Sequence, residues 1–324
     1  MYKVPVWLPI KSLGAVNVYA FSSDDGSLDL VDSGILSGRS ITSFVTVLKR
    51  GGLDPCKIRN IYITHFHVDH STMSLFLHRL SNARLFIGAG DYRVIEKGVE
   101  SFVRGAVRLF IEHGMSREEA ETIFKNHPAV RLADTYRELI DVEWNLLRED
   151  DEITLGKEKY RVIELPGHTP GHIGLLSSDG SKLFSGDVVL ERITPHVTIH
   201  DWRDNPLKDY LDTLYRIKNL GVKVIHPGHR EDITDPVRRI NELLEHHKTR
   251  LGEILEVLRK EGRLTGYEIA KRIKWRVRYS GWNEYPYAER FFALGEALAH
   301  LRYLEVEGLV TRKTCGASYC FASV

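Results

Sequence analysis

Four side chains that could bind a metal ion lie within the six residues HFHVDH at positions 65–70. An apolar run typical of a buried strand precedes them, and alternate side chains of an extended strand point to the same side. We therefore expect His65, His67 and Asp69 to converge, while His70 turns away where a helix begins. Because imidazole and carboxylate groups are the usual ligands of zinc, iron and manganese, the pattern predicts a metal site at the end of this strand.

A strand, a sharp turn containing glycine and a ligand-type side chain follow one another three times further along the chain, after the HFHVDH motif, which itself lacks a glycine turn. The turns are PGHTPGH at 166–172 after a strand over 160–165, Gly186-Asp187 after a strand over 182–185, and HPGH at 226–229 after a strand over 222–225. Open α/β sheets bind their ligands at the carboxyl ends of their strands. The spacing therefore predicts that separate parts of the chain bring ligands to one rim.

The elements around the first motif determine where it lies. Asp32 stands at the end of a predicted strand, where it could hold a ligand histidine from behind or cap its own turn, and both roles stay open. Ser71 is the candidate cap of the helix that follows the motif. The predicted elements are strands over 4–8, 15–21 and 28–32 and helices over 38–50 and 71–80.

A long helical stretch is predicted between about residues 90 and 147, after a strand over 84–87. Ser116 and Glu119 form a candidate capping box inside it, and a further helix is expected over 132–147. An insertion of this length between core strands would cover the metal crevice and shape the substrate pocket. Its aromatic side chains are expected mainly in the core.

Length and composition restrict the alternatives. The 324 residues, 43% of them hydrophobic, are enough for one large and one small domain. Lys+Arg 45 and Asp+Glu 44 nearly balance, so no overall field attracts nucleic acid or a membrane. The three cysteines are too few for a disulfide framework, and no segment reads as a signal peptide or a membrane span. These features predict a cytoplasmic protein.

The four motifs, in this order, resemble those of the metallo-β-lactamase-fold hydrolases. The resemblance extends over about residues 1–235 and is nearest to glyoxalase II and to an endoribonuclease branch called lactamase-beta-2-like, which carries a C-terminal winged helix. It implies an α/β fold, an αββα sandwich with a helical insertion and a small C-terminal winged-helix domain. We accordingly predict a catalytic domain over 1–245, with the insertion at about 90–147, and a winged-helix domain over 246–324.

The resemblance also implies the ligands of a two-metal site. The first metal would bind His65, His67 and His168, the second would bind Asp69, His70 and His229, and Asp187 would bridge them. His172 leads into the next strand and His226 shares a turn with His229, so both are predicted to be structural. The nitrogen and oxygen ligands suit zinc, iron and manganese alike, and zinc is our first expectation for the two divalent ions.

The resemblance implies hydrolysis by a metal-bridging hydroxide, so that no serine or cysteine nucleophile is required. The substrate would be an ester, thioester or lactone, as in glyoxalase II. Asp69 would orient the hydroxide, and His196 is the candidate proton donor. Leu190 stands where we would look for the tyrosine of the lactonases, and no cysteine near position 187 offers the zinc ligand found in some β-lactamases. The alternative is an endoribonuclease or phosphodiesterase of the lactamase-beta-2-like type.

The C-terminal part decides between these two classes of substrate. A basic run at 271–278 would suit RNA, but the helix over 287–303 is mostly apolar and carries Glu289 and Glu296, poor partners for phosphate. We therefore favour a module that packs on the catalytic domain or on the second subunit of a homodimer, with a small molecule as substrate. Further helices are predicted over 233–249, where His246 and His247 are expected to be exposed, over 251–260 and over 265–274, with a hairpin around Cys315-Gly316.

Overall fold

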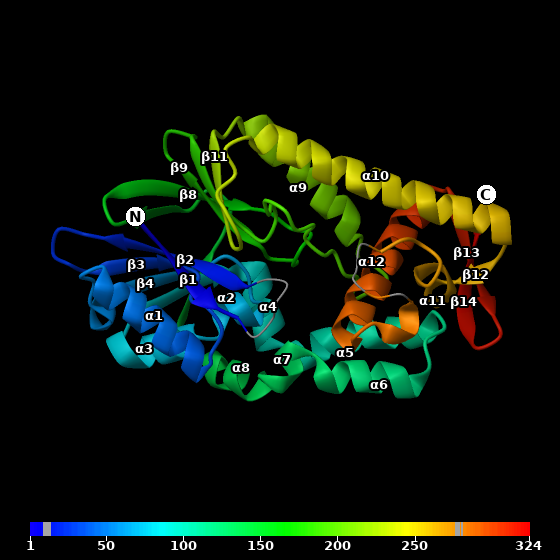
Figure 1. Ribbon diagram of the computed structural model, residues 1–324, viewed down its shortest axis with the longest axis horizontal. Helices are drawn as coiled ribbons and strands as arrows, with labels where there is room; N and C mark the ends of the chain where they lie inside the picture. Colours follow the sequence, from blue (N-terminus) through cyan, green and yellow to red (C-terminus); the bar gives the residue numbers. More distant parts are fainter. Residues whose placement is uncertain (9–13, 276–278, 280) are drawn as a thin grey trace. The chain divides into compact units, whose positions relative to one another are not determined.

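The computed structural model describes residues 1–8, 14–275, 279 and 281–324 (Figure 1). These residues form two compact units, each assembled from three segments of the chain. The first unit contains residues 1–98, 132–195 and 213–240, and the second contains residues 99–131, 196–212 and 241–324. The first unit is built around two β-sheets, whereas the second is mainly helical.

The first unit contains a six-stranded sheet in which the strands lie side by side in sequence order. It consists of β1 (Tyr2–Trp7), β2 (Ala15–Ser22), β3 (Leu28–Val31), β4 (Ile58–Ile63), β5 (Arg84–Gly88) and β6 (Trp144–Leu147). The first three strands are antiparallel, and β3 to β6 run parallel to one another. Because parallel strands end at the same edge, β4, β5 and β6 open on one rim.

A second sheet of five strands has the order β11-β10-β9-β8-β7. Its members are β7 (Glu152–Leu155), β8 (Glu158–Glu164), β9 (Ile173–Ser177), β10 (Lys182–Gly186) and β11 (Val224–Pro227). Neighbouring strands are antiparallel except β10 and β11, which are parallel. The central strand β9 is buried at all five positions, as expected for a strand covered on both faces.

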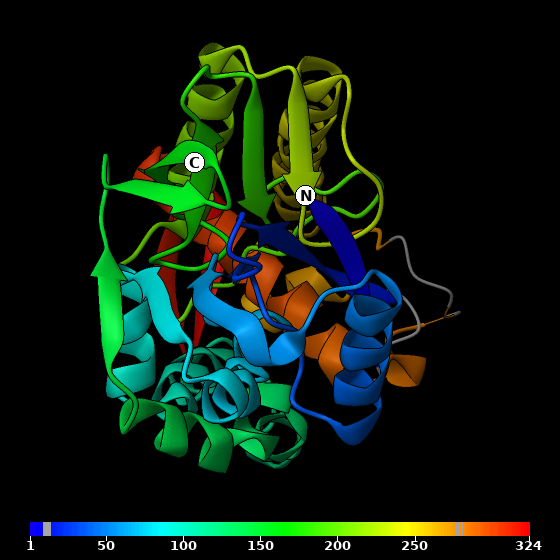
Figure 2. The ribbon, with the colours of Figure 1, turned by 90° about the vertical axis from the view of Figure 1, so that its left-hand side faces the viewer.

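The two sheets of this unit face each other (Figure 2). An apolar core lies between them, and both sheets contribute aromatic rings to it. Tyr19 of β2 and Phe184 of β10 meet edge to face, with ring centroids 4.9 Å apart. On the outer side of the first sheet lie α1 (Gly38–Arg50), α3 (Ser74–Ser81) and α4 (Ala89–Glu96). Beside β8, the end of α9 (Pro206–Leu220) contributes Arg216, which donates to the carbonyl of Glu164 at 2.9 Å. The predicted αββα sandwich is thereby confirmed.

The second unit combines helices of the predicted insertion with the C-terminal part of the chain. It contains α5 (Val99–Glu112), α6 (Arg117–Asn126), α7 (Pro128–Arg131), most of α10 (Pro236–Glu261), α11 (Gly266–Ala270), α12 (Tyr287–Val306) and a three-stranded sheet of β12 (Leu264–Thr265), β14 (Ser318–Ser323) and β13 (Val310–Cys315). Nine consecutive residues of α12, from 293 to 301, are buried, so the helix is covered on all sides. Its neighbours in this unit include α5, α6, α11 and β13.

Several predicted helices have other bounds in the structure. The helix expected over 132–147 is wrong beyond residue 140, because α8 (Ala133–Ile140) ends there and residues 144–147 pair with β5 as strand β6. The indole of Trp144 donates to the carbonyl of Leu139 at 2.8 Å, which closes the end of α8. The helices expected over 233–249 and 251–260 are one continuous helix, α10, in which Gly252 is accommodated.

The helix predicted over 71–80 is likewise divided. A short helix, α2 (Val68–Ser71), precedes α3, whose N-cap is Met73 rather than the expected Ser71. The Ser71 hydroxyl instead donates to the carbonyl of Phe66 at 2.7 Å. In the C-terminal part, the helix expected over 265–274 covers only Gly266–Ala270, and Arg276 and Arg278 of the basic run lie outside the described residues.

The predicted division into domains at residue 245 stays a prediction, because compactness does not show which part of a chain folds or acts on its own. The same holds for the assignment of the C-terminal part as a winged helix. Within the part of the chain that the structure describes, no helix combines the length and apolarity needed to cross a bilayer.

Candidate metal centre

The loops with the predicted ligands all follow strands of the first unit. HFHVDH comes after β4, PGHTPGH after β8, Asp187 after β10 and His229 after β11. Gly228 shows how closely these loops approach one another. A Cβ atom at that position would lie 2.3 Å from Asp187 Oδ1 and 2.6 Å from His70 Cε1, so only glycine leaves the space between the ligands open.

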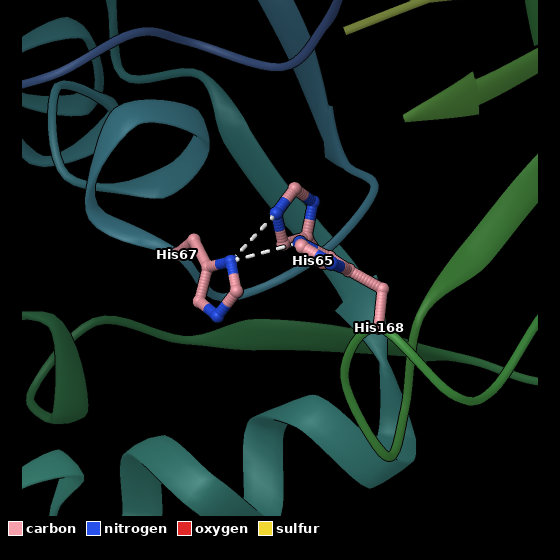
Figure 3. Close-up of side chains that lie close together, drawn as sticks. All are labelled: His65, His67 and His168. Carbon is pink, nitrogen blue, oxygen red and sulfur yellow. Dashed lines mark hydrogen bonds between the residues drawn. The ribbon is translucent and has the colours of Figure 1, made fainter. Parts of the chain in front are cut away.

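The first cluster consists of His65, His67 and His168, whose rings point toward one another (Figure 3). His67 Nδ1 lies 3.1 Å from His65 Nε2 and 3.1 Å from His168 Nε2. His65 is fully buried and His67 is half-buried. Three imidazole nitrogens at this spacing can serve as ligands of one metal ion.

The second cluster consists of Asp69, His70 and His229. Its two imidazoles are oriented from behind, since His70 Nδ1 lies 2.8 Å from Asp32 Oδ2 and His229 Nδ1 lies 2.7 Å from the carbonyl oxygen of Ala15. When Nδ1 donates, Nε2 carries the free lone pair, and both Nε2 atoms face Asp69 Oδ2, at 3.9 and 3.4 Å.

Asp187 stands between the two clusters. Its Oδ1 lies 3.4 Å from His70 Nε2, and its Oδ2 lies 3.4 Å from His229 Nε2 and 3.9 Å from His168 Nε2. One carboxylate thus reaches a ligand of the first cluster and two ligands of the second. This is the geometry expected of a bridging ligand.

The polar atoms at this centre suit a cation. His70 Nε2, His229 Nε2 and Asp187 Oδ1 are buried and have no hydrogen-bond partner among the described residues. A buried polar atom without a partner costs about 1–3 kcal/mol, a cost that a divalent ion bound to these lone pairs would remove. Although burial opposes it, the carboxylates of Asp187 and Asp69 raise the pKa of His229 to about 10. A metal ion would displace that proton.

Asp32 holds a predicted ligand histidine, His70, which is the first of the two roles considered for it. Besides holding His70, its Oδ1 accepts the backbone N–H of Thr64 at 2.8 Å. Its φ of 62° lies in the left-handed region, which aspartate tolerates better than most residues. Asp32 therefore fixes both the end of β4 and the ring orientation of a ligand.

His172 and His226 lie outside the three-ligand groups that the described residues form, in agreement with their structural role. His172 stacks on His65, with ring centroids 4.8 Å apart, and its Nε2 accepts the N–H of Asp187 at 3.2 Å. His226 Nδ1 lies 3.0 Å from Asp232 Oδ2, and the ring stacks on Phe184. His172 thus holds the backbone of Asp187, the predicted bridging residue.

The expected convergence of His65, His67 and Asp69 is wrong in one respect. Because α2 begins at Val68, Asp69 follows helical rather than extended geometry and joins His70 and His229 instead. The alternation of an extended chain therefore holds only for the first two histidines.

The remaining predicted residues belong to the second unit. His196 packs against Phe292, with ring centroids 4.5 Å apart, and its catalytic role stays a prediction. The expected exposure of His246 and His247 is wrong: His247 is fully buried with Nδ1 3.1 Å from His300 Nε2, and His246 is half-buried. The physical reason is that α10 continues unbroken and turns this face toward α12.

One residue near the centre was missed from the sequence. Asp91 follows β5 and the turn Gly88-Ala89-Gly90, and its fully buried carboxylate contacts two of the ligand loops. The signal was present, because a strand, a glycine turn and a ligand-type side chain occur here as they do at the ligands. A hollow of about 320 Å³, with Arg93 and Arg148 in its lining, lies beside the same loops.

Comparisons with known proteins agree with this geometry. The chain superposes on the crystal structure of a metallo-beta-lactamase family protein from Thermus thermophilus with a TM-score of 0.80 and 30% identity, covering 100% of this chain and 98% of that one. It is 22% identical to a probable metallo-hydrolase of Bacillus subtilis (strain 168) over 93% of this chain and 91% of the relative.

Shorter matches name other relatives. A beta-lactamase-like protein 2 homolog of Caenorhabditis elegans is 30% identical over 49% of each chain, so this chain matches about half of that relative. A human acyl-coenzyme A thioesterase is 35% identical over 26% of this chain and 30% of its own length. Residues 12–229, more than half of the chain, match the sequence model of the family described as the metallo-beta-lactamase superfamily. The chain belongs to the metallo-beta-lactamase superfamily.

Proposed function

We propose that this protein is a hydrolase with two divalent metal ions, zinc being our first expectation, and that it cleaves a thioester or a related ester. The observation that carries the proposal is the position of Asp187, whose two oxygens face ligands of both clusters. A single-metal site would not need a carboxylate in that place. Iron and manganese remain alternatives that metal analysis would distinguish.

Two divalent ions held in this way would supply a water of lowered pKa and a Lewis acid for the developing negative charge. The chain itself sets the direction of approach. His70 and His229 are fully buried, whereas Asp69 and Asp187 each keep 8% of their surface exposed and His67 is half-buried. We therefore expect substrate and water to enter from the side of the half-buried His67, and Asp69 could accept a hydrogen bond from the attacking water.

Several features favour a thioester over a lactone or RNA. Leu190, in place of the lactonase tyrosine, is 2% exposed and contributes no hydroxyl group. The hollow beside the ligand loops has Arg93 and Arg148 in its lining against one carboxylate, that of Glu164, and the two guanidinium groups would favour substrates with a carboxylate or phosphate. A human relative bears the name of an acyl-coenzyme A thioesterase, and bacterial relatives are named hydroxyacylglutathione hydrolases.

The alternative, cleavage of RNA, has less support from the C-terminal part. The helix that would enter a nucleic-acid groove, α12, is buried on all sides within the second unit. Two basic residues of the run also have intramolecular partners, since Arg272 pairs with Glu261 at 2.6 Å and Lys271 lies over the ring of Tyr267. A small-molecule substrate is therefore our proposal for this site.

The test is to count metal ions in the purified full chain and to measure hydrolysis of S-lactoylglutathione, an acyl-coenzyme A, an acyl homoserine lactone and single-stranded RNA. Asp187→Ala should abolish activity, whereas Asp179→Ala, in the turn between β9 and β10, should retain it. Activity that survives chelation or Asp187→Ala would refute the two-metal mechanism. RNA cleavage without thioester cleavage would favour the alternative. Loss of turnover in His196→Ala, with metal content unchanged, would support its role as proton donor.

A further inference from the structure

Asp91, in the first turn of α4, connects the two loops that supply the first cluster. Its Oδ2 accepts the N–H of Phe66 at 2.8 Å and the hydroxyl of Thr169 at 2.7 Å, and its Oδ1 accepts the N–H of Gly171 at 2.7 Å. Phe66 lies between His65 and His67, and Thr169 directly follows His168. One carboxylate therefore holds the backbone between His65 and His67, the side chain next to His168 and the backbone of Gly171 in the same loop.

The backbones at this junction leave no room for adjustment. A Cβ atom on Gly171 would lie 1.9 Å from the nitrogen of Asp91, and one on Gly88 would lie 2.3 Å from the carbonyl oxygen of Gly171. The loop 166–172 is thus pressed against the end of β5 and the first turn of α4. Charge-assisted hydrogen bonds across such a contact fix the relative position of two loops better than side-chain packing would.

The second cluster has different supports. His70 is held by Asp32, His229 by the carbonyl of Ala15, and Asp187 by the ring of His172. None of these contacts involves Asp91. Asp91 therefore contacts the loops of the first cluster directly, whereas the second cluster has further supports of its own.

We propose that Asp91 is a positioning residue that sets the affinity of the first cluster, and of that cluster alone, for its metal ion. The inference rests on the proposed two-metal function. Its carboxylate keeps His65 and His67 at the distance from His168 that one ion requires. Without it, the two loops would be joined mainly by packing, and the ion would bind a less preorganised set of ligands.

The molecule offers a matched control for a merely structural role. Asp29 in β3 is also fully buried and accepts hydrogen bonds from Asn60 Nδ2 at 2.7 Å, from the N–H of Gly156 at 2.9 Å and from Arg59 at 3.1 Å. It joins both sheets of the first unit but contacts none of the predicted ligands. Asp29→Asn should therefore reduce stability without changing the affinity for metal ions.

The experiment titrates the metal-free full chain with Co²⁺, follows the visible absorption of each bound ion, and measures Zn²⁺ affinity against a chromophoric chelator. Asp91→Asn keeps the size of the side chain but replaces one acceptor oxygen with a donor, so one of the two backbone N–H groups loses its partner. We expect one of the two ions to bind about 10–100-fold more weakly with an altered spectrum, and the other to bind as in the wild type. Thr169→Val, which removes only the hydroxyl contact, should weaken the same ion by a smaller factor and serves if Asp91→Asn does not fold.

Each outcome decides something different. Unchanged binding of both ions in Asp91→Asn and Thr169→Val, or an equal loss at both sites, would overturn the positioning role and leave the proposed function intact. The same loss of metal affinity in Asp29→Asn would show that general destabilisation is the cause, and this result would also overturn the positioning role of Asp91. A wild-type chain that binds only one ion, or none, would overturn the proposed two-metal function and this inference with it.

Discussion

His113 offers a direct test of burial in the second unit. It follows the end of α5, is fully buried and packs against aromatic rings, with its centroid 4.6 Å from that of Trp202 and 5.5 Å from that of Phe321. Its Nδ1 lies 2.7 Å from the carbonyl oxygen of Leu109, while Nε2 has no hydrogen-bond partner among the described residues. Burial, together with the charge of Arg312, lowers its pKa to about 4, although the hydrogen bond to Leu109 and the charge of Glu305 oppose the shift.

The sign and size of the effect follow from this pKa. In the unfolded chain this histidine takes up a proton near the ordinary histidine pKa of 6.5, but in the folded chain it does so only near pH 4. Between these values the unfolded state binds more protons, so the free energy of unfolding falls as the pH falls. For this group alone, the loss between about pH 7 and about pH 5 is about 2 kcal/mol, and the full shift corresponds to about 3 kcal/mol.

The assay measures the free energy of unfolding of the wild type and of His113→Phe in urea, at about pH 7 and about pH 5. Tryptophan fluorescence, to which the stacked Trp202 contributes, monitors the unfolding. The variant loses the hydrogen bond to Leu109, but that cost is the same at both pH values and cancels in the difference. We expect the pH-dependent loss of stability to be about 2 kcal/mol smaller in the variant. An equal loss in both proteins would refute the reasoning. Other buried histidines, such as His300 with a pKa of about 3, add to the acid sensitivity of both proteins alike.

Three further outcomes are expected. Asp32→Asn should weaken the binding of one of the two ions about 10–100-fold in a chelator competition, because His70 loses its orienting carboxylate. Gly171→Ala should lower the melting temperature, because its Cβ would meet the backbone of Asp91. Gly252→Ala lies in α10 with open space around the added Cβ, so it should raise the free energy of unfolding in urea by about 0.5–1 kcal/mol. Thr265→Ala should cost about 1 kcal/mol of stability, because the hydroxyl accepts the N–H of Glu268 at 3.2 Å in the capping box of α11; no change would show that the box is dispensable.

The strands and the ligand motifs were predictable because their signals are local. An apolar run of five or six residues followed by a glycine turn specifies a buried strand and the place where it ends. The bounds of α1, Gly38–Arg50, agree with the prediction, since Ser37 caps its start and Gly51 follows its end. The same strand-and-turn pattern positions His65, His168, Asp187 and His229.

The features that could not be predicted from the sequence depend on contacts between residues far apart in the chain. The burial of His247 requires α12 on the other side of it, and nothing within α10 indicates which face that will be. Strand β6 is four residues long with one buried position, so its own pattern is too weak to compete with the helical reading. Asp91 was overlooked because its partners, Phe66 and Gly171, belong to two other loops.

The hydrogen bonds between β2 and the loop 227–229 also determine the stage of folding at which the second cluster can form. His229 is oriented by Ala15, the N–H of Asn17 donates to Gly228 at 2.7 Å, and the hydroxyl of Tyr19 donates to Pro227 at 2.8 Å. These contacts join the beginning of the first sheet to the last strand of the second, so they form only after a large loop has closed. During synthesis, the HFHVDH motif leaves the ribosome long before residue 229, so Asp69 and His70 can meet His229 only after that residue has been synthesised. The second cluster, which contains His229, can therefore be completed only after β11 has joined the fold.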